Sequence, residues 1–292
     1  MCSSDLEHNS DIFFDLTAFT ELNLPGYAIT GIVGAESLGF GMYNIYFGRR
    51  NLFTKEVNNI FVKIKRDNRI GTFEDFFGEH YLNFLAVREP NVFEPQHIKN
   101  QKERVINHVK QLNAISYASA YITFEEDLTM EEVYEMSMKY PDVKFAWVGI
   151  RTAPKDEVVQ YLTGFPIDPN AGSVADDRPD KDKYLAFQLL DWLRSNSTGS
   201  RQKSIWPKGY ELHYTSLLRY MIDRKEAVNV LDYNNLKTEY YQSALDYVEE
   251  HGVKTFGVLV YANAEDLMEL IENESVKTVE LDQVMASKRY IY

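Results

Sequence analysis

Cysteine is almost absent from this sequence, since Cys2 is the only one in 292 residues. A single cysteine can form neither a disulfide framework nor a thiolate metal site. No apolar run approaches the roughly 20 residues that a membrane-spanning helix needs. No N-terminal stretch has the basic-then-apolar order of a signal peptide. Taken at face value, these absences describe a soluble cytoplasmic protein.

Motifs for catalysis and nucleotide binding are missing as well. Gly31, Gly34, Gly39 and Gly41 crowd a short span, but no Lys-Ser or Lys-Thr follows them and the G-x-G-x-x-G spacing is absent. Tight turns or bulges are therefore a better interpretation than a phosphate-binding loop. The six histidines show no zinc-ligand spacing. We predict no catalytic, cofactor-binding or metal-binding residues, although groups distant in sequence can still assemble in a fold.

Acidic side chains are in clear excess, with a formal net charge of −13. This charge argues against a nucleic-acid partner and against docking on anionic lipid. Its simplest interpretation is solubility. Aromatic residues make up 14% of the chain, a high share that favours a β-rich interior or an interaction surface.

The N-terminus has an unusual composition. Met1-Cys-Ser-Ser-Asp-Leu6 resembles the translation of a sequencing-adaptor fragment, and such scars are excluded from fold reasoning. We therefore expect residues 1–10 to be a non-native or disordered leader that makes few contacts. On this interpretation, the natural N-terminal region, including any membrane helix, lies outside the sequence.

Residues 143–150 give the clearest structural signal. This stretch is apolar apart from Lys144, is too short for a typical helix and is rich in β-branched and aromatic residues. It therefore predicts a strand that is buried on both faces, with Trp147 in the core. Upstream, Thr129 followed by Glu132 matches the capping box of a helix start. With a further strand expected at 117–124, the order is strand, helix, buried strand.

A second unit with the same order and similar spacing occurs near the end of the chain. A buried strand at 255–261 is followed by Asn263, which can cap a helix, and by a strand at 276–284. A β-α-β connection places its two strands parallel, with the helix on one face of the sheet. We predict an α+β fold whose mixed sheet contains two β-α-β units with helices packed on it.

The remaining patterns suggest a division into parts. Residues 11–112 form a β-rich N-terminal region, with strands at 42–47 and 59–64 and either a strand or a short helix at 11–24. Residues 113–292 form the α+β domain. Helices are expected at 184–193, 211–222 and 236–249, and a Ser-rich loop at 195–208. In that loop, Trp206 beside Pro207 is the better candidate for an exposed aromatic contact.

Several segments together resemble a known family. Phe145-Ala-Trp-Val-Gly-Ile-Arg-Thr152 with Gly164-Phe165-Pro166, and later Val253-Lys-Thr-Phe-Gly-Val-Leu-Val260, are similar to the C-terminal sigma-factor-regulator domain of bacterial membrane-bound anti-sigma factors. The resemblance extends from about Tyr117 to Asp282 and is weaker from Gly26 to Ile64. It rests on core positions and glycines rather than on a catalytic motif.

The resemblance implies a non-enzymatic, extracytoplasmic sensor domain of a single-pass anti-sigma factor. In such proteins a cytoplasmic segment holds the sigma factor, and one membrane helix connects it to the outer domain. Both of those parts are absent from this sequence. The expected partners are therefore a sigma factor, through the missing segment, and an unknown extracytoplasmic ligand or protein.

Recognition is expected in the long loops, 153–183 and 195–208, because loops on a rigid scaffold commonly carry binding. Two alternatives remain open from the sequence. One is an enzyme of unknown reaction, and the other is a binding module that is unrelated to sigma factors.

Overall fold

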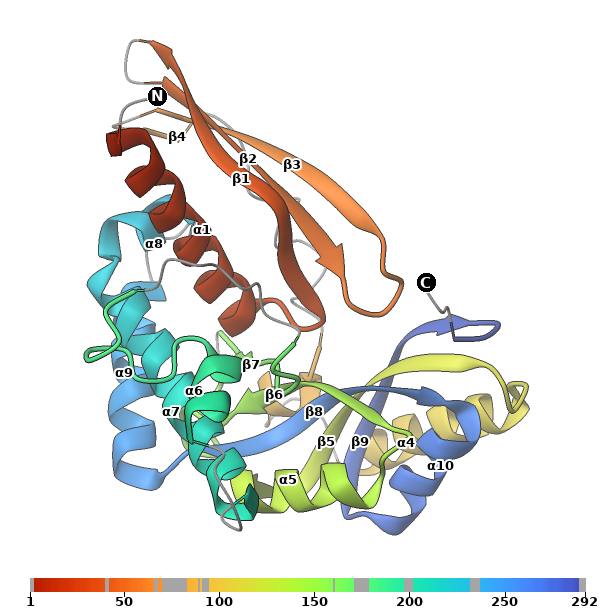
Figure 1. Ribbon diagram of the computed structural model, residues 1–292. Helices are drawn as coiled ribbons and strands as arrows, with labels where there is room; N and C mark the ends of the chain where they lie inside the picture. Colours follow the sequence, from red (N-terminus) through yellow and green to blue (C-terminus); the bar gives the residue numbers. More distant parts are fainter. Residues whose placement is uncertain are drawn as a thin grey trace.

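The computed structural model describes residues 3–39, 42–65, 68–69, 83–88, 90, 95–159, 161–170, 179–196, 202–231 and 237–288 of the chain. These described residues form two β-sheets with helices packed around them (Figure 1). A five-stranded sheet lies across the centre. The N-terminal helix and a long antiparallel sheet rise above it, and one group of helices stands beside it.

The five-stranded sheet has the order β7-β6-β8-β5-β9, and every neighbouring pair is antiparallel. Its strands are β5 (Tyr117–Thr129), β6 (Lys144–Ile150), β7 (Thr163–Phe165), β8 (Lys254–Asn263) and β9 (Val276–Met285). The strands predicted at 117–124, 143–150, 255–261 and 276–284 are all confirmed. The α+β class is also confirmed.

The predicted mixed sheet is wrong, and the reason lies in how the two β-α-β units combine. β5 and β6 run in the same direction, but β8 lies between them and is antiparallel to both. In the same way, β5 lies between β8 and β9. Each unit therefore places a strand in the gap of the other, which is the split β-α-β arrangement of ferredoxin-like folds. No parallel pair is hydrogen-bonded in the described sheet.

Helices α5 (Met130–Lys139) and α10 (Ala264–Asn273) pack on one face of this sheet, as their apolar spacing predicts. The capping box of α5 is confirmed: Thr129 accepts the Glu132 amide, and the Glu132 carboxylate accepts the Thr129 amide. Asn263 is the N-cap residue of α10, as expected. However, its side chain makes no capping bond and contacts Asp266 instead.

The opposite face of the sheet carries a second apolar cluster. Trp147 is only 1% exposed there, which confirms its predicted place in the core. Phe84, from the short segment Asn83–Arg88 that contains helix α3 (Leu85–Arg88), covers this face and contacts the rings of Tyr121 and Phe256. We call residues 83–88 the strap. Gly257 lies directly beneath Phe84, and a Cβ there would come within 2.9 Å of its ring.

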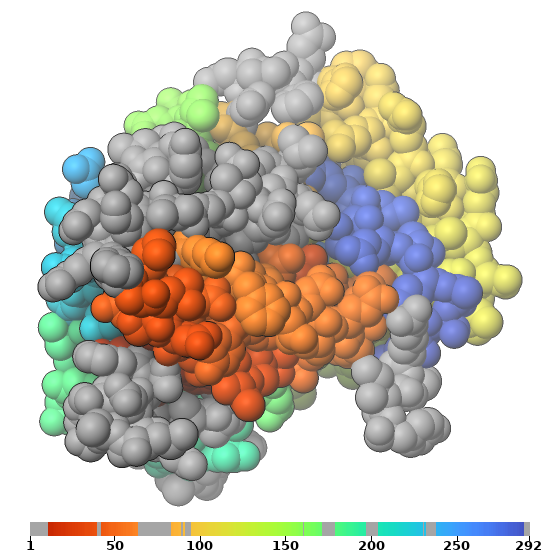
Figure 2. All heavy atoms as spheres, turned by 90° about the horizontal axis from the view of Figure 1, so that it is seen from above, coloured from red at the N-terminus to blue at the C-terminus, as the bar shows by residue number. Residues whose placement is uncertain are grey.

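The N-terminal part begins with a helix, α1 (Ser3–Asn23), which settles the open choice at 11–24. A turn at Gly26 with φ +79° leads into a sheet of four strands, of which the last has only two residues. The strands are β1 (Tyr27–Gly39), β2 (Met42–Asn51), β3 (Val57–Lys65) and β4 (Asn68–Arg69). Seen from above, this sheet crosses the middle of the molecule (Figure 2). Gly31, with φ +75°, lies at a register shift of β1, as the glycine pattern suggested.

One apolar core joins residues of α1 and of the N-terminal sheet to those of the five-stranded sheet and its helices. The division at residue 112 stays a prediction. The leader expected at 1–10 also stays a prediction. Helix α1 begins at Ser3, but the side chains of its first residues lie outside the described part, so their contacts are not tested.

The other helices surround this core. Two predictions about them, the helix at 184–193 and the loop at 195–208, need correction. The helices are α4 (Pro95–Gln111), α6 (Leu189–Asn196), α7 (Gln202–Asp223), α8 (Lys225–Leu231) and α9 (Lys237–His251). Residues 184–188 are turns rather than helix, because the backbone of Ala186 bonds to side chains of α7. The loop predicted at 195–208 is wrong at Ser195 and Asn196, which end α6, and from Gln202 onward, where α7 begins; residues 197–201 lie outside the described part.

Packing explains the early start of α7. Trp206 is half-buried and stacks on Tyr134 with 6.1 Å between ring centroids, so it is not an exposed contact. Pro207 lies inside the helix, where its ring fits helical φ at the loss of one backbone bond. Among the described residues, no helix is both long enough and apolar enough to cross a membrane.

Replacing Trp147 tests the core at the junction of β6 and α1. Its indole Nε1–H donates a 2.8 Å hydrogen bond to the Glu21 carbonyl. We expect Trp147→Ala to cost about 3–5 kcal/mol of unfolding free energy, because it leaves a large cavity. Trp147→Phe keeps most of the ring and should cost only about 1–2 kcal/mol for the lost bond. Urea unfolding measures both, and near-wild-type stability of the alanine variant would contradict the core assignment.

Glu280 of β9 holds the strap to the sheet. Its carboxylate accepts hydrogen bonds from the backbone amides of Phe84, at 3.0 Å, and Leu85, at 3.1 Å. Burial raises the pKa of Glu280 to about 7, although those amides and the nearby Arg88 favour the charged form. Tyr121 lies opposite Glu280 on β5, and Asp282 follows it on β9. The folded chain therefore prefers Glu280 protonated.

This preference predicts a pH dependence of stability. The folded-state pKa lies above the ordinary value of 4.5, so the stabilisation is complete below that value and is lost as the pH rises through about 7. The unfolding free energy of the wild type should fall between pH 5 and pH 8. In Glu280→Gln we expect this fall to be smaller by roughly 2–3 kcal/mol. Glu272→Gln, at an exposed ion pair with Lys110, is the control. Equal pH profiles for Glu280→Gln and the wild type would disprove the coupling.

Candidate functional site

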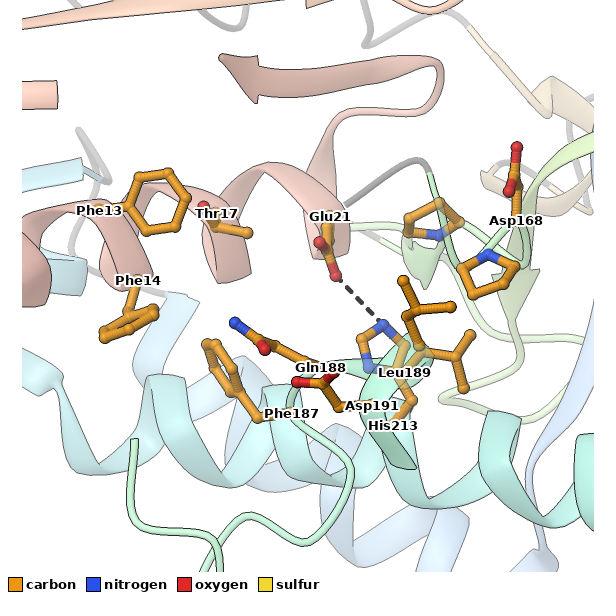
Figure 3. Close-up of a pocket in the computed structure, with 13 residues that line it drawn as sticks. Phe13, Phe14, Thr17, Glu21, Asp168, Phe187, Gln188, Leu189, Asp191 and His213 are labelled. Carbon is orange, nitrogen blue, oxygen red and sulfur yellow. Dashed lines mark ion pairs between the residues drawn. The ribbon is translucent and has the colours of Figure 1, made fainter. Parts of the chain in front are cut away.

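A small cavity lies where α1 meets α6, α7 and the segment after β7 (Figure 3). Its volume is about 30 Å³, enough for a water molecule or two. We call this region the α1 seam. Its lining residues are Phe13, Phe14, Thr17, Glu21, Pro166, Asp168, Pro169, Phe187, Gln188, Leu189, Leu190, Asp191 and His213.

A buried ion pair closes one side of the cavity. Glu21 Oε2 of α1 lies 3.1 Å from His213 Nε2 of α7, and the two side chains are 8% and 3% exposed. His213 Nδ1 lies 2.9 Å from the Ala186 carbonyl oxygen. Because a carbonyl only accepts, Nδ1 must carry a proton and donate. Nε2 lies against Glu21 Oε2 at ion-pair distance, although Oε2 makes no hydrogen bond within the described residues.

The position of His213 is fixed by two neighbours besides Glu21. Its ring packs edge-on against Phe165, with 5.5 Å between centroids. Ala186 holds Nδ1, and its own amide donates to Ser216 one turn further along α7. Only Nε2 is left to face α1. The geometry therefore directs the Nε2 atom of His213 at the N-terminal helix.

Asp15 forms a second polar connection between α1 and the other helices. Arg224, in the corner between α7 and α8, donates to both carboxylate oxygens of Asp15 at 2.8 Å, and Tyr220 donates to Oδ1 at 2.9 Å. Asp15 is 6% exposed. Burial raises its pKa above the ordinary value even though Arg224 and Tyr220 favour the carboxylate. A bidentate arginine is the strong geometry for such a pair.

The end of α1 is attached to two further elements. Asn23 Nδ2 donates to the Tyr241 hydroxyl of α9 at 2.8 Å. The Glu21 carbonyl accepts from Trp147 of β6. Directional bonds thus connect α1 to β6, α7, the α7–α8 corner and α9, in addition to its apolar packing.

Three polar atoms beside the cavity are buried without a hydrogen-bond partner in the described part of the chain. They are Thr17 Oγ1, Gln188 Oε1 and Glu21 Oε2, the last of which lies at ion-pair distance from His213. Unsatisfied buried groups of this kind cost free energy, and an ordered water is the usual remedy. Figure 3 shows these side chains around the cavity, with Thr17 and Glu21 on one side and Gln188 across from them. The seam is therefore polar at its centre and apolar at its rim, where Phe13, Phe14 and Phe187 lie.

A second, open cavity of about 320 Å³ adjoins the seam. Phe187, Gln188 and Asp191 line both cavities. The other residues that line it are Pro179, Lys181, Tyr184, Leu185, Trp192, Ser195 and Asn196. Its volume is at the lower end of the range for small-molecule sites.

The sequence interpretation had assigned no site residues, and it missed the seam. It treated each histidine as a surface or internally satisfied group, and His213 is a buried, paired one. The available signal was in residues 13–22, where Asp15 and Glu21 stand among large apolar side chains. Buried carboxylates in such a run need partners. Among the described residues, no group of three or more His, Cys, Asp or Glu side chains could hold a metal ion.

A double-mutant cycle tests the Glu21–His213 pair. Removing one partner leaves a buried polar group unpaired, so Glu21→Leu or His213→Leu alone should cost about 3–5 kcal/mol. The double variant leaves neither group unpaired and should cost less than the sum, with a coupling of roughly 1–3 kcal/mol. The exposed Lys208–Glu211 pair of α7 is the control, with expected coupling of about 0–1 kcal/mol. Additive effects at Glu21 and His213 in chemical unfolding would contradict the pair.

Comparison with known proteins gives one match. Residues 109–283 match the family model described as sigma factor regulator C-terminal. Neither the curated proteins nor the solved structures include a match. The matched region runs from the end of α4 to β9 and contains His213, whereas α1 and Glu21 lie outside it. The resemblance seen in the sequence is thus confirmed, and the chain belongs to the sigma factor regulator C-terminal family.

Proposed function

We propose that this chain is a non-enzymatic regulatory region of an anti-sigma factor and that α1 transmits its state to a sigma-factor-binding segment. The family gives the regulatory context. One observation supports the role of α1: Glu21, which lies outside the family region, is buried against His213 within it. A change in the family region that moves α7 must therefore act on α1.

The mechanism is a shift between two positions of α1, docked and released. Release exposes Asp15 and Glu21 to water and leaves Arg224 and His213 without their partners. A stimulus can shift this equilibrium only if it binds one state more tightly than the other. A change from 1:99 to 99:1 needs a difference of about 5.5 kcal/mol, an amount that one buried pair and its neighbours can supply.

The open cavity beside the seam is the proposed entry point of the stimulus. Its rim is formed by Pro179 and Lys181 at the end of the first predicted recognition loop and by Ser195 and Asn196 at the start of the second. Gln188 and Asp191 belong to both the open cavity and the seam. A ligand that moves α6 would thereby change the surroundings of Glu21.

We further propose that this region is extracytoplasmic and that a single membrane helix precedes it in the full-length protein. The sigma factor would then bind on the cytoplasmic side. This arrangement rests on the resemblance to membrane-bound anti-sigma factors. In this arrangement α1 is the element closest in sequence to the membrane helix. A movement of the outer region would therefore reach the membrane helix through α1 and the chain before it.

Two arginines at the C-terminal end of α7, Arg219 within it and Arg224 directly after it, provide a matched test in cells. Arg224 holds Asp15 of α1, whereas Arg219 pairs with the exposed Glu249 of α9. In the full-length regulator, we expect Arg224→Gln to change transcription from a sigma-dependent reporter several-fold without stimulus. Arg219→Gln should leave it unchanged. Asp15→Asn gives a second, isosteric way to weaken the same contact.

Thermal melting of each purified variant must accompany the reporter, so that unfolding is not mistaken for signalling. If folded Arg224→Gln and Asp15→Asn proteins both signal normally, α1 does not carry the state. Robust turnover by the wild-type chain in a broad hydrolase and transferase panel would overturn the non-enzymatic assignment.

A further inference from the structure

The strap is attached to the five-stranded sheet by one aromatic side chain. Phe84 is 1% exposed and lies on the face of the sheet opposite to α5 and α10. Its ring makes edge-on contacts with Tyr121 of β5, at 5.1 Å between centroids, and with Phe256 of β8, at 5.0 Å. The Trp147 ring of β6 lies 6.3 Å away. Three rings from three strands therefore surround Phe84, and we call them the socket.

The backbone of the strap is strained where Phe84 enters the socket. Its φ is +55°, which a bulky side chain rarely adopts. The amides of Val87 and Arg88 donate to the Phe84 carbonyl at 2.9 and 3.1 Å, and Arg88 Nε donates to the Asn83 carbonyl at 2.8 Å. These bonds give the strap a shape of its own. Strain of this kind persists only where the surroundings enforce it, and it is typical of clamps and switches.

Glu280 provides the polar attachment of the strap. Its carboxylate accepts the amides of Phe84 and Leu85, so a closed strap separates it from water. Burial raises the pKa of Glu280 to about 7. Opening the strap returns the group to water, which favours the charged form. Closure is therefore fully supported below the ordinary pKa of 4.5 and loses this support as the pH rises through about 7.

The charged groups around Glu280 come from three elements. Arg88 of the strap favours the charged form without offsetting burial. Tyr121 lies opposite on β5, and burial raises its pKa well above the ordinary value, so this phenol stays neutral near pH 7. Asp282 follows on β9. Helix α4 also packs against β9, but its Lys102 bonds to the backbone at the first residue of that strand. Glu280 is thus the group placed to titrate near neutrality.

The strap also supports the loop that follows β6. The Val159 amide donates to the Arg88 carbonyl at 3.3 Å, and Val159 belongs to the same apolar cluster as Phe84. This loop continues into β7 and then to Pro166 and Asp168, which line the cavity of the α1 seam. The strap therefore connects β9 to a segment that ends at the seam.

We propose that the strap is a releasable clamp, closed while Glu280 is protonated and opened when Glu280 is charged, and that its release frees Val159 and the loop after β6. The aromatic socket gives the closed state its place, and the strained backbone at Phe84 favours release. The clamp does not depend on signalling through α1. Only its effect on the α1 seam rests on the proposed function.

The test is hydrogen exchange of the purified chain at pH 5 and pH 8, with each amide compared with the unfolded chain at the same pH. Protection of the Leu85 and Val159 amides should fall at least about tenfold between these values. In Glu280→Gln their protection should stay nearly constant. Glu272→Gln, at an exposed ion pair, is the control and should behave like the wild type.

The reference for local release is the amide of Val258, in the middle of β8. It should be at least about tenfold more protected than Leu85, and dilute urea should accelerate its exchange but not that of Leu85, because release exposes little surface. Equal protection of Leu85 and Val258, or the same pH profile in the wild type and Glu280→Gln, would overturn the clamp. Full protection of Val159 while Leu85 loses its own would overturn the link to the loop. Neither result bears on the α1 proposal, which the reporter tests separately.

Discussion

Burial of acidic side chains on α1 is the constraint on which the arrangement of this molecule depends. A helix that inserts Phe14, Phe19 and Leu22 into a core carries Asp15 and Glu21 in with them. A buried carboxylate is tolerated only when it is paired and hydrogen-bonded. The partners come from the helices inserted between β6 and β8, as Arg224 and His213. The N-terminal helix and the family region are therefore stable together in one relative position.

Much of the family region could be predicted from the sequence, because its elements have strong local patterns. The strand predicted in the apolar run at 143–150 and the capping box at Thr129 are both as expected. The strand pairing could not be predicted in the same way. A β-α-β pattern specifies that two strands are parallel, but it does not say whether a third strand lies between them. That choice depends on contacts between β5 and β8, which are far apart in sequence.

The α1 seam was harder to predict because the residues that form it show no clear local pattern in the sequence. Residues 11–24 mix large apolar and acidic side chains, and only tertiary packing decides that the segment is a helix with both kinds buried. Pro207 and the serines before it indicated a loop, yet stacking of Trp206 on Tyr134 stabilises a helix through that position. His213 has no ligand-like spacing in the sequence. Its importance comes from Ala186, which fixes one ring nitrogen and leaves the other facing α1.

The apolar and the polar contacts of α1 constrain its position in different ways. Apolar burial holds α1 against the core, but it is non-directional and permits small shifts along the helix axis. The bonds from Arg224 and Trp147, together with the close contact between His213 and Glu21, define one register of α1, because each forms only when its partner lies within about 3 Å. In the proposed mechanism, a stimulus that disturbs those bonds changes the register of α1 while most of the buried area remains. The polar contacts of the seam, rather than its apolar ones, are therefore the part of the interface that can switch.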